Sequence, residues 1–383
     1  MSIYLDYNAS APIDSRVLET MMSVYTEDIG NADSRTHEYG DNARNVVETA
    51  RKQVASLLKV DTGEVFFTSG ATESNNIAIR GLEEYADTTS KHHIITTSIE
   101  HKAVLETVKH LGNKGYEIDI VAPDEAGRVS TDEILRKVRD DTLLVSVMHV
   151  NNETGIIQPV EEIGAELEKR GVLFHVDATQ SCGKLVEELQ KLKYNMLSFS
   201  AHKLRGPQGI GVLVLKKKAY KLPPVKAITF GGQQEHGIRP GTIPVALTAG
   251  CGKACELALN EYKDNEKKTE SIKKEIMKIL DESGIQYQIN GDANSCISSA
   301  INICIDGVAS EALMLSTKQY CGLSNGSACT SHSYSPSYVL SAMGLPVERI
   351  ENSIRVSWGP ETDINLLKEN FSELINVAKS MVW

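Results

Sequence analysis

The chain has 383 residues, with 40 Lys and Arg against 51 Asp and Glu, so its formal net charge is −11 with histidine counted as neutral. Hydrophobic residues make up 41% and charged residues 24%, which is typical of globular proteins and excludes collagen-like, low-complexity and disordered chains. The acidic balance argues against direct binding to a nucleic-acid backbone, which needs clustered cations. No apolar run approaches the roughly 20 residues that cross a bilayer.

The N-terminus and the cysteines narrow the class of protein further. Residues 1–7 lack a basic region followed by an apolar stretch, so we expect no signal peptide and a cytoplasmic protein without membrane contact. The seven cysteines are odd in number and form no CxxC pair, which argues against a disulfide framework and against a metal site of the zinc-ribbon type. We expect most of these thiols to be small hydrophobic core residues.

Short β-branched runs alternate with helical patterns through the first half of the chain. Strands are predicted at residues 64–68, 93–97, 118–121, 143–150, 173–177, 196–200 and 211–215. Helices are predicted at residues 75–85, 101–111, 131–138 and 160–170. This alternation is typical of an α/β unit with a mainly parallel sheet, in which ligands bind at the carboxyl ends of the strands.

A long charged helix at about residues 254–282 is followed by predicted strands at 297–305 and 353–357. We expect the helix to lead from a large domain, residues 15–255, into a smaller α+β domain, residues 256–383. Residues 1–14 are expected to pack with this smaller domain.

The strongest local signal surrounds Lys203, which follows a predicted strand and precedes a Gly-Pro turn. A lysine in a partly desolvated pocket loses its proton easily and can form a Schiff base with a carbonyl. Ser200 and His202 beside it are suited to bind phosphate. The alternative for any lone lysine is a surface position in a loop.

Three other strand ends carry matching chemistry. Asp177 can pair with a protonated ring nitrogen, or cap a helix. The small residues of segment 68–75, with the hydroxyl of Thr72, can hold an anion at a helix N-terminus. The same residues could instead only cap the helix. The segment is not a Walker A loop, because it lacks the Gly-Lys-Ser/Thr ending. His101 can stack on a planar ring and move protons, or be structural. Together with Lys203 these groups predict a pyridoxal phosphate site.

Nearly the whole chain resembles the cysteine desulfurases, a class V group within the fold-type I pyridoxal-phosphate enzymes. The resemblance includes Asp177-Ala178-Thr179-Gln180, Ala201-His202-Lys203 and Ser327-Ala328-Cys329-Thr330-Ser331. Further matching segments are residues 4–9, 70–75, 100–104, 151–155, 239–242 and 353–357. The resemblance implies a fold-type I transferase, with a large domain built on a mainly parallel seven-stranded sheet and a smaller α+β domain.

The resemblance also implies a role for each matching residue. Lys203 is expected to carry the internal aldimine of pyridoxal 5'-phosphate, Asp177 to pair with the pyridine nitrogen and His101 to stack on the ring. Gln180 is expected at the phenolic oxygen, and Asn152 and Arg355 at the substrate carboxylate, for which a guanidinium fork is well suited. The phosphate is expected to lie among Ala71, Thr72, Ser200, His202 and, from the other subunit of a homodimer, Thr242.

Cys329 lies in a small, polar, glycine-containing stretch, a composition that predicts a mobile loop. A loop cysteine is often incidental, but the resemblance makes it the nucleophile that takes sulfur from L-cysteine as a persulfide, leaving L-alanine. The Ser-Ala-Cys-Thr-Ser pattern resembles the long-loop branch, in which the cysteine travels to an acceptor protein. Residues 331–336 are less typical of housekeeping members, so iron–sulfur assembly, tRNA thiolation and DNA phosphorothioation all stay open as pathways.

Three rival functions remain at this point. A selenocysteine lyase and an aminotransferase share the scaffold, although an aminotransferase needs no nucleophilic loop thiol. A non-catalytic scaffold for sulfur-acceptor proteins belongs to a different class, and the complete set of cofactor residues argues against it.

Overall fold

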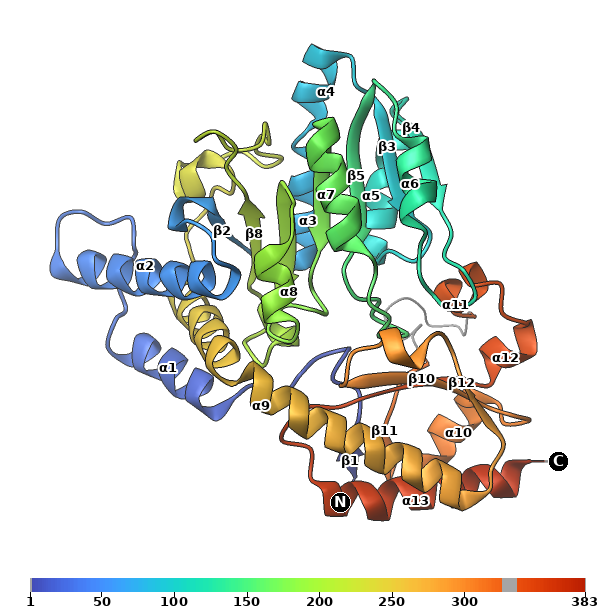
Figure 1. Ribbon diagram of the computed structural model, residues 1–383. Coiled ribbons are helices and arrows are strands. Elements are labelled where there is room, and N and C mark those ends of the chain that lie inside the picture. The colour runs from blue at the N-terminus through green and yellow to red at the C-terminus, as the bar shows by residue number, and fades with distance from the viewer. Residues whose placement is uncertain (1, 326–335, 383) are drawn as a thin grey trace.

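The computed structural model describes residues 2–325 and 336–382, and its centre is a seven-stranded sheet (Figure 1). Its strands are β2 (Val65–Thr68), β3 (His93–Thr97), β4 (Glu117–Val121), β5 (Thr142–Met148), β6 (Leu173–Asp177), β7 (Met196–Ser200) and β8 (Gly211–Leu215). The strand order is β2-β8-β7-β6-β5-β3-β4, and β8 is antiparallel to both of its neighbours while the other pairs are parallel. The predicted mainly parallel fold-type I sheet is therefore confirmed.

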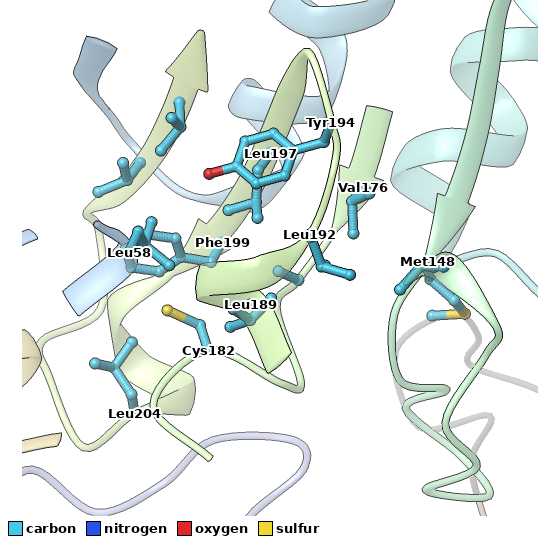
Figure 2. Close-up of a cluster of buried hydrophobic side chains, with 14 of the residues drawn as sticks. Leu58, Met148, Val176, Cys182, Leu189, Leu192, Tyr194, Leu197, Phe199 and Leu204 are labelled. Atoms are coloured by element: carbon cyan, nitrogen blue, oxygen red, sulfur yellow. The ribbon is translucent and has the colours of Figure 1, made fainter. Parts of the chain in front are cut away.

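Alternating side chains give this sheet two buried faces, because successive residues of a strand point to opposite sides. Phe67 packs into one core and its neighbour Phe66 into the other. The first core includes residues of α2 (Glu38–Leu58), α7 (Val160–Arg170) and α8 (Val186–Lys191). The second includes residues of α3 (Ala71–Arg80), α4 (Glu83–Thr89) and α5 (Lys102–Gly112). Figure 2 shows part of the first core, where Cys182 and Leu204 lie close to Phe199.

A separate hydrophobic core surrounds a three-stranded antiparallel sheet in the order β12-β10-β9. These strands are β9 (Tyr287–Ile289), β10 (Ala300–Ile305) and β12 (Ser353–Ser357), packed with α10 (Ser310–Thr317) and α13 (Ile364–Met381). The N-terminal strand β1 (Ile3–Tyr4) pairs in parallel with β11 (Cys321–Gly322) beside this core. The domain boundaries given above stay a prediction.

One long helix, α9 (Val245–Ser283), contributes to both cores and connects them (Figure 1). Cys251 and Cys255 belong to the core of the large sheet, and Ile272 and Ile276 to the core of the small sheet. The remaining helices are α1 (Ser15–Thr26), α6 (Thr131–Lys137), α11 (Tyr338–Ala342) and α12 (Val347–Glu351). No helix within the described residues has the length and apolar character that a membrane span requires.

Two predicted helices differ from the structure. The helix predicted at 75–85 is two helices, α3 and α4, because the chain turns at Gly81, where a Cβ would collide with the backbone of Lys226. Helix α9 starts at Val245, well before the predicted residue 254, directly after Pro244. A proline suits a helix start because the first N–H groups of a helix have no partner within it.

Candidate active site

The sheet topology brings the predicted site residues to one edge. Strands β3, β5, β6 and β7 are parallel neighbours, so their carboxyl ends lie together. His101 follows β3, Asn152 follows β5, and Asp177 ends β6. The turn after β7 contains Lys203. This is the edge at which parallel α/β sheets bind ligands.

The Lys203 amine points into the protein. Lys203 closes a short 3-10 turn after β7 and is only partly exposed. Its Nζ donates hydrogen bonds to the carbonyl oxygens of Asn8 and Ala9, at 2.6 and 2.5 Å. The alternative of a surface lysine is therefore excluded, and the N-terminal segment forms the opposite wall of the cleft.

Asp177 is a buried carboxylate held rigidly at the end of β6, with 4% of its surface exposed. Its Oδ2 accepts a hydrogen bond from Asn75 Nδ2 at 2.8 Å, and its Oδ1 accepts from the backbone N–H and the hydroxyl of Thr179, at 3.0 and 2.5 Å. These bonds fix the orientation of the carboxylate. Neither Asn75 nor Thr179 is among the predicted site residues, although each lies in a segment that resembles the family.

The anion cradle lies at the start of α3. Ala71 donates its backbone N–H to Ser200 Oγ at 2.7 Å, so the first turn of α3 meets the end of β7. A Cβ at Gly211 would lie 2.5 Å from Gly70 Cα, so this close approach requires glycine. Thr72 is exposed at the same helix end, whose free N–H groups and dipole favour an anion.

Both site histidines are neutral. Burial lowers the pKa of His101, with Asp177 raising it and Lys203 lowering it further. His101 Nδ1 accepts a hydrogen bond from the backbone N–H of Ala103 at 3.1 Å, which leaves the proton on Nε2. Burial, assisted by the charge of Lys203, lowers the pKa of His202 to about 4, and its Nδ1 lies 3.2 Å from Ser10 Oγ.

Glu100 is a functional candidate that the sequence analysis missed, although it directly precedes His101. Its side chain is fully buried, and Oε1 accepts hydrogen bonds from Thr97 Oγ1 at 2.7 Å and from the Met148 N–H at 2.8 Å. Burial, assisted by the charge of Asp177, raises the pKa of Glu100 to about 8. A neutral carboxyl group therefore ties the end of β3 to the end of β5.

Arg355 and Asn152 meet at the side of the cleft that faces the small sheet. Arg355 is 4% exposed, and its guanidinium donates to Asp6 Oδ1 at 2.6 Å and to the carbonyl oxygen of Asn152 at 3.0 Å. Gln180 Nε2 donates to the carbonyl oxygen of Asn8 at 2.9 Å, which places it beside the same N-terminal segment as Lys203.

Several buried polar atoms in this cleft lack a hydrogen-bond partner within the described residues. They are Asn8 Oδ1, Asn75 Oδ1, Asn152 Oδ1, Gln180 Oε1 and Arg355 Nε. Buried polar atoms are nearly always paired, so such a cluster marks the position of a polar ligand. The donor and acceptor set, the anion cradle and the inward lysine fit pyridoxal phosphate and an amino acid.

Two predicted site residues are not placed in the cleft. Thr242 is exposed in the segment before α9. Cys329 lies outside the described residues, 2–325 and 336–382. The chain on either side of it is anchored next to the cleft: the Ser324 carbonyl accepts from the Arg355 N–H at 2.6 Å, and Ser337 Oγ donates to the buried carboxylate of Glu153.

The described cysteines match the expectation that most thiols are core residues, because all except the half-buried Cys296 are buried.

Comparisons with known proteins agree with this geometry. The family model for aminotransferase class-V matches residues 3–367. The chain is 42% identical over 361 residues to the cysteine desulfurase IscS of Photorhabdus laumondii, covering 94% of this chain and 88% of the relative.

Two solved structures extend the comparison to the fold. A structure titled NifS-like protein superimposes with a TM-score of 0.90 at 34% identity, covering 99% of this chain and all of the other. A structure titled SspA in complex with cysteine gives a TM-score of 0.82 at 32% identity, covering 94% of this chain and all of the other. The chain therefore belongs to the class-V aminotransferase family, and within it to the pyridoxal-phosphate-dependent cysteine desulfurases.

Proposed function

We propose that the protein removes sulfur from L-cysteine, releases L-alanine and passes the sulfur to an acceptor protein. The observation that carries this proposal is the inward Lys203 amine, which shares one cleft with the buried Asp177 carboxylate and the unpaired polar atoms. Bound pyridoxal phosphate supplies an aldehyde for amine capture and an electron-withdrawing ring. Lys203 would hold the cofactor through its amine and move the proton at the substrate Cα, and Asp177 would hold the proton on the ring nitrogen.

The remaining described residues bind and orient the two molecules. The phosphate would lie against Ser200, His202, Ala71 and Thr72, and neutral His101 would stack on the ring and donate from Nε2. Gln180 would donate to the phenolic oxygen after releasing Asn8.

Arg355 and Asn152 bind the substrate carboxylate in this proposal. The guanidinium already holds the Asp6 carboxylate, and its Nε is unpaired within the described residues, so a second carboxylate can bind without moving the arginine. The structural neighbour whose title names cysteine as its ligand supports this choice of substrate.

Cys329 is proposed to be the sulfur acceptor within the chain. Residue 324 is hydrogen-bonded to Arg355, and residue 337 to Glu153, which directly follows Asn152. Chain anchored at both ends beside the substrate carboxylate site can present its cysteine to the substrate sulfur. The Cys329 thiolate would attack that sulfur, the bond between the sulfur and Cβ would break with its electron pair left on the carbon skeleton, and protons delivered to Cβ and Cα would complete alanine. The acceptor for the persulfide belongs to iron–sulfur assembly, tRNA thiolation or DNA phosphorothioation.

A cytoplasmic homodimer completes the proposal. The exposed residues Leu18, Met22, Tyr25 and Ile29 recur at helical spacing on and just after α1 and give an apolar stripe of the kind that dimers cover. Thr242 is exposed and available to reach the phosphate of a partner subunit.

Replacement of Lys203 tests the proposal. The purified protein loaded with pyridoxal phosphate is expected to show a visible cofactor band, and borohydride reduction is expected to fix the cofactor on Lys203. Lys203→Ala should lose both signals, whereas Lys216→Ala, at the opposite end of β7, should keep them. Cofactor fixed elsewhere, or a band retained in Lys203→Ala, contradicts the assignment.

The rival activities give different products. Transamination yields a keto acid and no persulfide, and a selenocysteine lyase turns over selenocysteine far faster than cysteine. Equal release of alanine and sulfur from L-cysteine supports the proposal over both rivals. Alanine release by the isolated protein also excludes a non-catalytic scaffold.

A further inference from the structure

A second lysine lies on the wall of a cavity that Lys203 also lines. This cavity, of about 440 Å³, lies between the turns that follow β6 and β7 and helix α9. Lys184 and Lys203 both line it, together with Cys182, Leu204 and Trp358. None of the phosphate-cradle or ring-binding residues described above lines it, so the cavity approaches Lys203 from a side that the cofactor does not use.

The fold dictates that the two lysines are neighbours. Strands β6 and β7 are adjacent and parallel, so the turns that follow them leave the sheet at the same edge. Lys184 ends a turn in which its N–H bonds to the Ser181 carbonyl at 2.9 Å and Gly183 takes a positive φ of 78°. Cys182 and Leu204, which lie near Lys184 and Lys203 in sequence, are buried in the same core cluster (Figure 2). The two backbone turns are therefore fixed relative to each other.

Lys184 has no anionic partner within the described residues, where no carboxylate lies within ion-pair distance of its amine. Carboxylates on the cavity wall have other partners: Glu261 contacts Arg16 at 2.5 Å, and Glu188 contacts His149 at 3.4 Å. Burial, assisted by the charge of Lys203, lowers the pKa of Lys184 to about 8. Lys184 is therefore still mainly charged at pH 7. Repulsion between two like charges is mutual, so the charge on each lysine disfavours protonation of the other amine.

Other ionisable groups surround the two amines. Those on the cavity wall are Tyr7, Asp14, Cys182, Glu188, Arg205, Glu261, Tyr262, Glu266, Glu270, Lys273 and Cys296. Those that face Lys203 from the cofactor side include His101, His202 and Asp177, of which both histidines are neutral. Lys184 lines the same cavity as Lys203, and the charge of Lys203 lowers the pKa of Lys184, so the two amines lie close enough to repel each other when both are protonated.

We propose that Lys184 is a positioning residue whose charge, held on the cavity wall beside Lys203, favours the neutral form of the Lys203 amine. A neutral amine is the form that captures an aldehyde and accepts a proton, and a neighbouring cation is one of the ways in which proteins provide it. This inference rests on the proposed function of Lys203. In this role Lys184 contacts neither the substrate nor the cofactor.

The test follows the protonation of Lys203 in Lys184→Met, a variant of similar length without charge. In the full chain stripped of cofactor, the acetylation rate of Lys203 is measured from pH 5 to pH 10 by peptide mass spectrometry. The midpoint is expected to rise by about 1 pH unit in Lys184→Met. In the cofactor-loaded protein, the pH midpoint of the visible band should rise in the same direction.

Two further variants make the result specific. Lys184→Arg keeps the charge and should restore the wild-type midpoints. Lys216→Met removes a half-buried lysine of lowered pKa that follows β8 and lies beside the first residue of β7. It should leave both midpoints unchanged. Unchanged midpoints in Lys184→Met, or an equal shift in Lys184→Arg, would overturn the inference. A wild-type protein that never acquires a visible band contradicts the proposed function instead, and the acetylation profile still decides the role of Lys184.

Discussion

Two buried carboxyl groups at the same sheet edge have different hydrogen bonding. Asp177 accepts three hydrogen bonds, which fix the carboxylate in place. Glu100 Oε2 has no partner within the described residues, and burial, assisted by the charge of Asp177, raises the pKa of Glu100 to about 8. Buried acids with a strongly shifted pKa are common in active sites.

Glu100→Gln should remove a pH dependence of stability. In the unfolded chain Glu100 loses its proton near the ordinary glutamate pKa of 4.5, whereas the folded residue keeps it until about pH 8. The unfolded state therefore binds fewer protons between these values, and the wild-type free energy of unfolding falls as pH rises. Glutamine retains the acceptor for Thr97 and Met148 and has no charge to lose.

We expect Glu100→Gln to be close to the wild type in stability at pH 5 and to be more stable by about 4 kcal/mol at pH 8.5. Urea unfolding of the cofactor-loaded proteins at both values measures the difference. If both proteins show the same change in stability between the two pH values, Glu100 is ionised in the folded protein.

Individual residues show how far sequence reasoning reaches into the site. Lys203, Asp177 and His101 could be found because each follows a strand and carries distinctive chemistry. Asn75 and Glu100 could not be found in the same way, since their roles depend on groups that are distant in sequence and that only the fold brings beside them. No sequence motif marks Lys184 as a site residue. It lies on the same cavity wall as Lys203 only because the turns after β6 and β7 are neighbours in the fold.

At the scale of elements, a buried ion pair fixes the segment that precedes α9. Arg51 on α2 donates two hydrogen bonds to the Glu235 carboxylate, at 3.0 and 2.7 Å, and lies 4.9 Å from the centre of the Phe67 ring. Glu235 also accepts from the Phe67 N–H at 2.7 Å and has a positive φ of 46°. The pair therefore holds a strained turn on the way to Thr242.

Arg51→Met should leave the Glu235 carboxylate buried without a cation. Breaking a buried pair costs about 3–5 kcal/mol, because the remaining charge stays desolvated. Thermal and urea unfolding should show this loss, whereas Lys52→Met, at the exposed next residue, should change stability by less than about 0.5 kcal/mol. Equal effects of the two changes would mean that the pair contributes nothing specific.

The order of elements was more predictable than their ends. Strands β3, β6, β7, β8 and β12 have the predicted bounds, because each is a short run that contains β-branched or large apolar residues. The predicted strand at 297–305 begins later, as β10 at Ala300, since only its later residues pair with β12. The early start of α9 comes from small residues that pack between α1 and α2, a tertiary effect.

At the scale of the whole molecule, the cleft lies between two cores that α9 connects. Arg355 reaches it from the small sheet, and Lys203 from the large one. The N-terminal segment pairs with β11 and supplies the carbonyl groups that hold Lys203. Substrate and cofactor sites are therefore contributed by different parts of the fold.

The dimer proposal predicts that charge on the α1 stripe separates the subunits. Met22 and Tyr25 are 53% and 58% exposed, and their double replacement by lysine should give a monomer that releases its cofactor faster on dialysis. Leu315 and Val347, 65% and 64% exposed on α10 and α12, are matched control sites whose double replacement by lysine should leave a dimer. Sedimentation velocity distinguishes the forms, and an intact dimer in the α1 variant would place the interface elsewhere.

The most direct test of the central claim measures alanine and persulfide together. Purified wild-type protein loaded with pyridoxal phosphate is incubated with L-cysteine, and mass spectrometry locates any added sulfur. We predict one alanine for each sulfur added to Cys329 in a single turnover, and neither product from Lys203→Ala. Alanine formation at the wild-type rate in Cys329→Ala, or sulfur added elsewhere in the wild-type chain, would contradict the account.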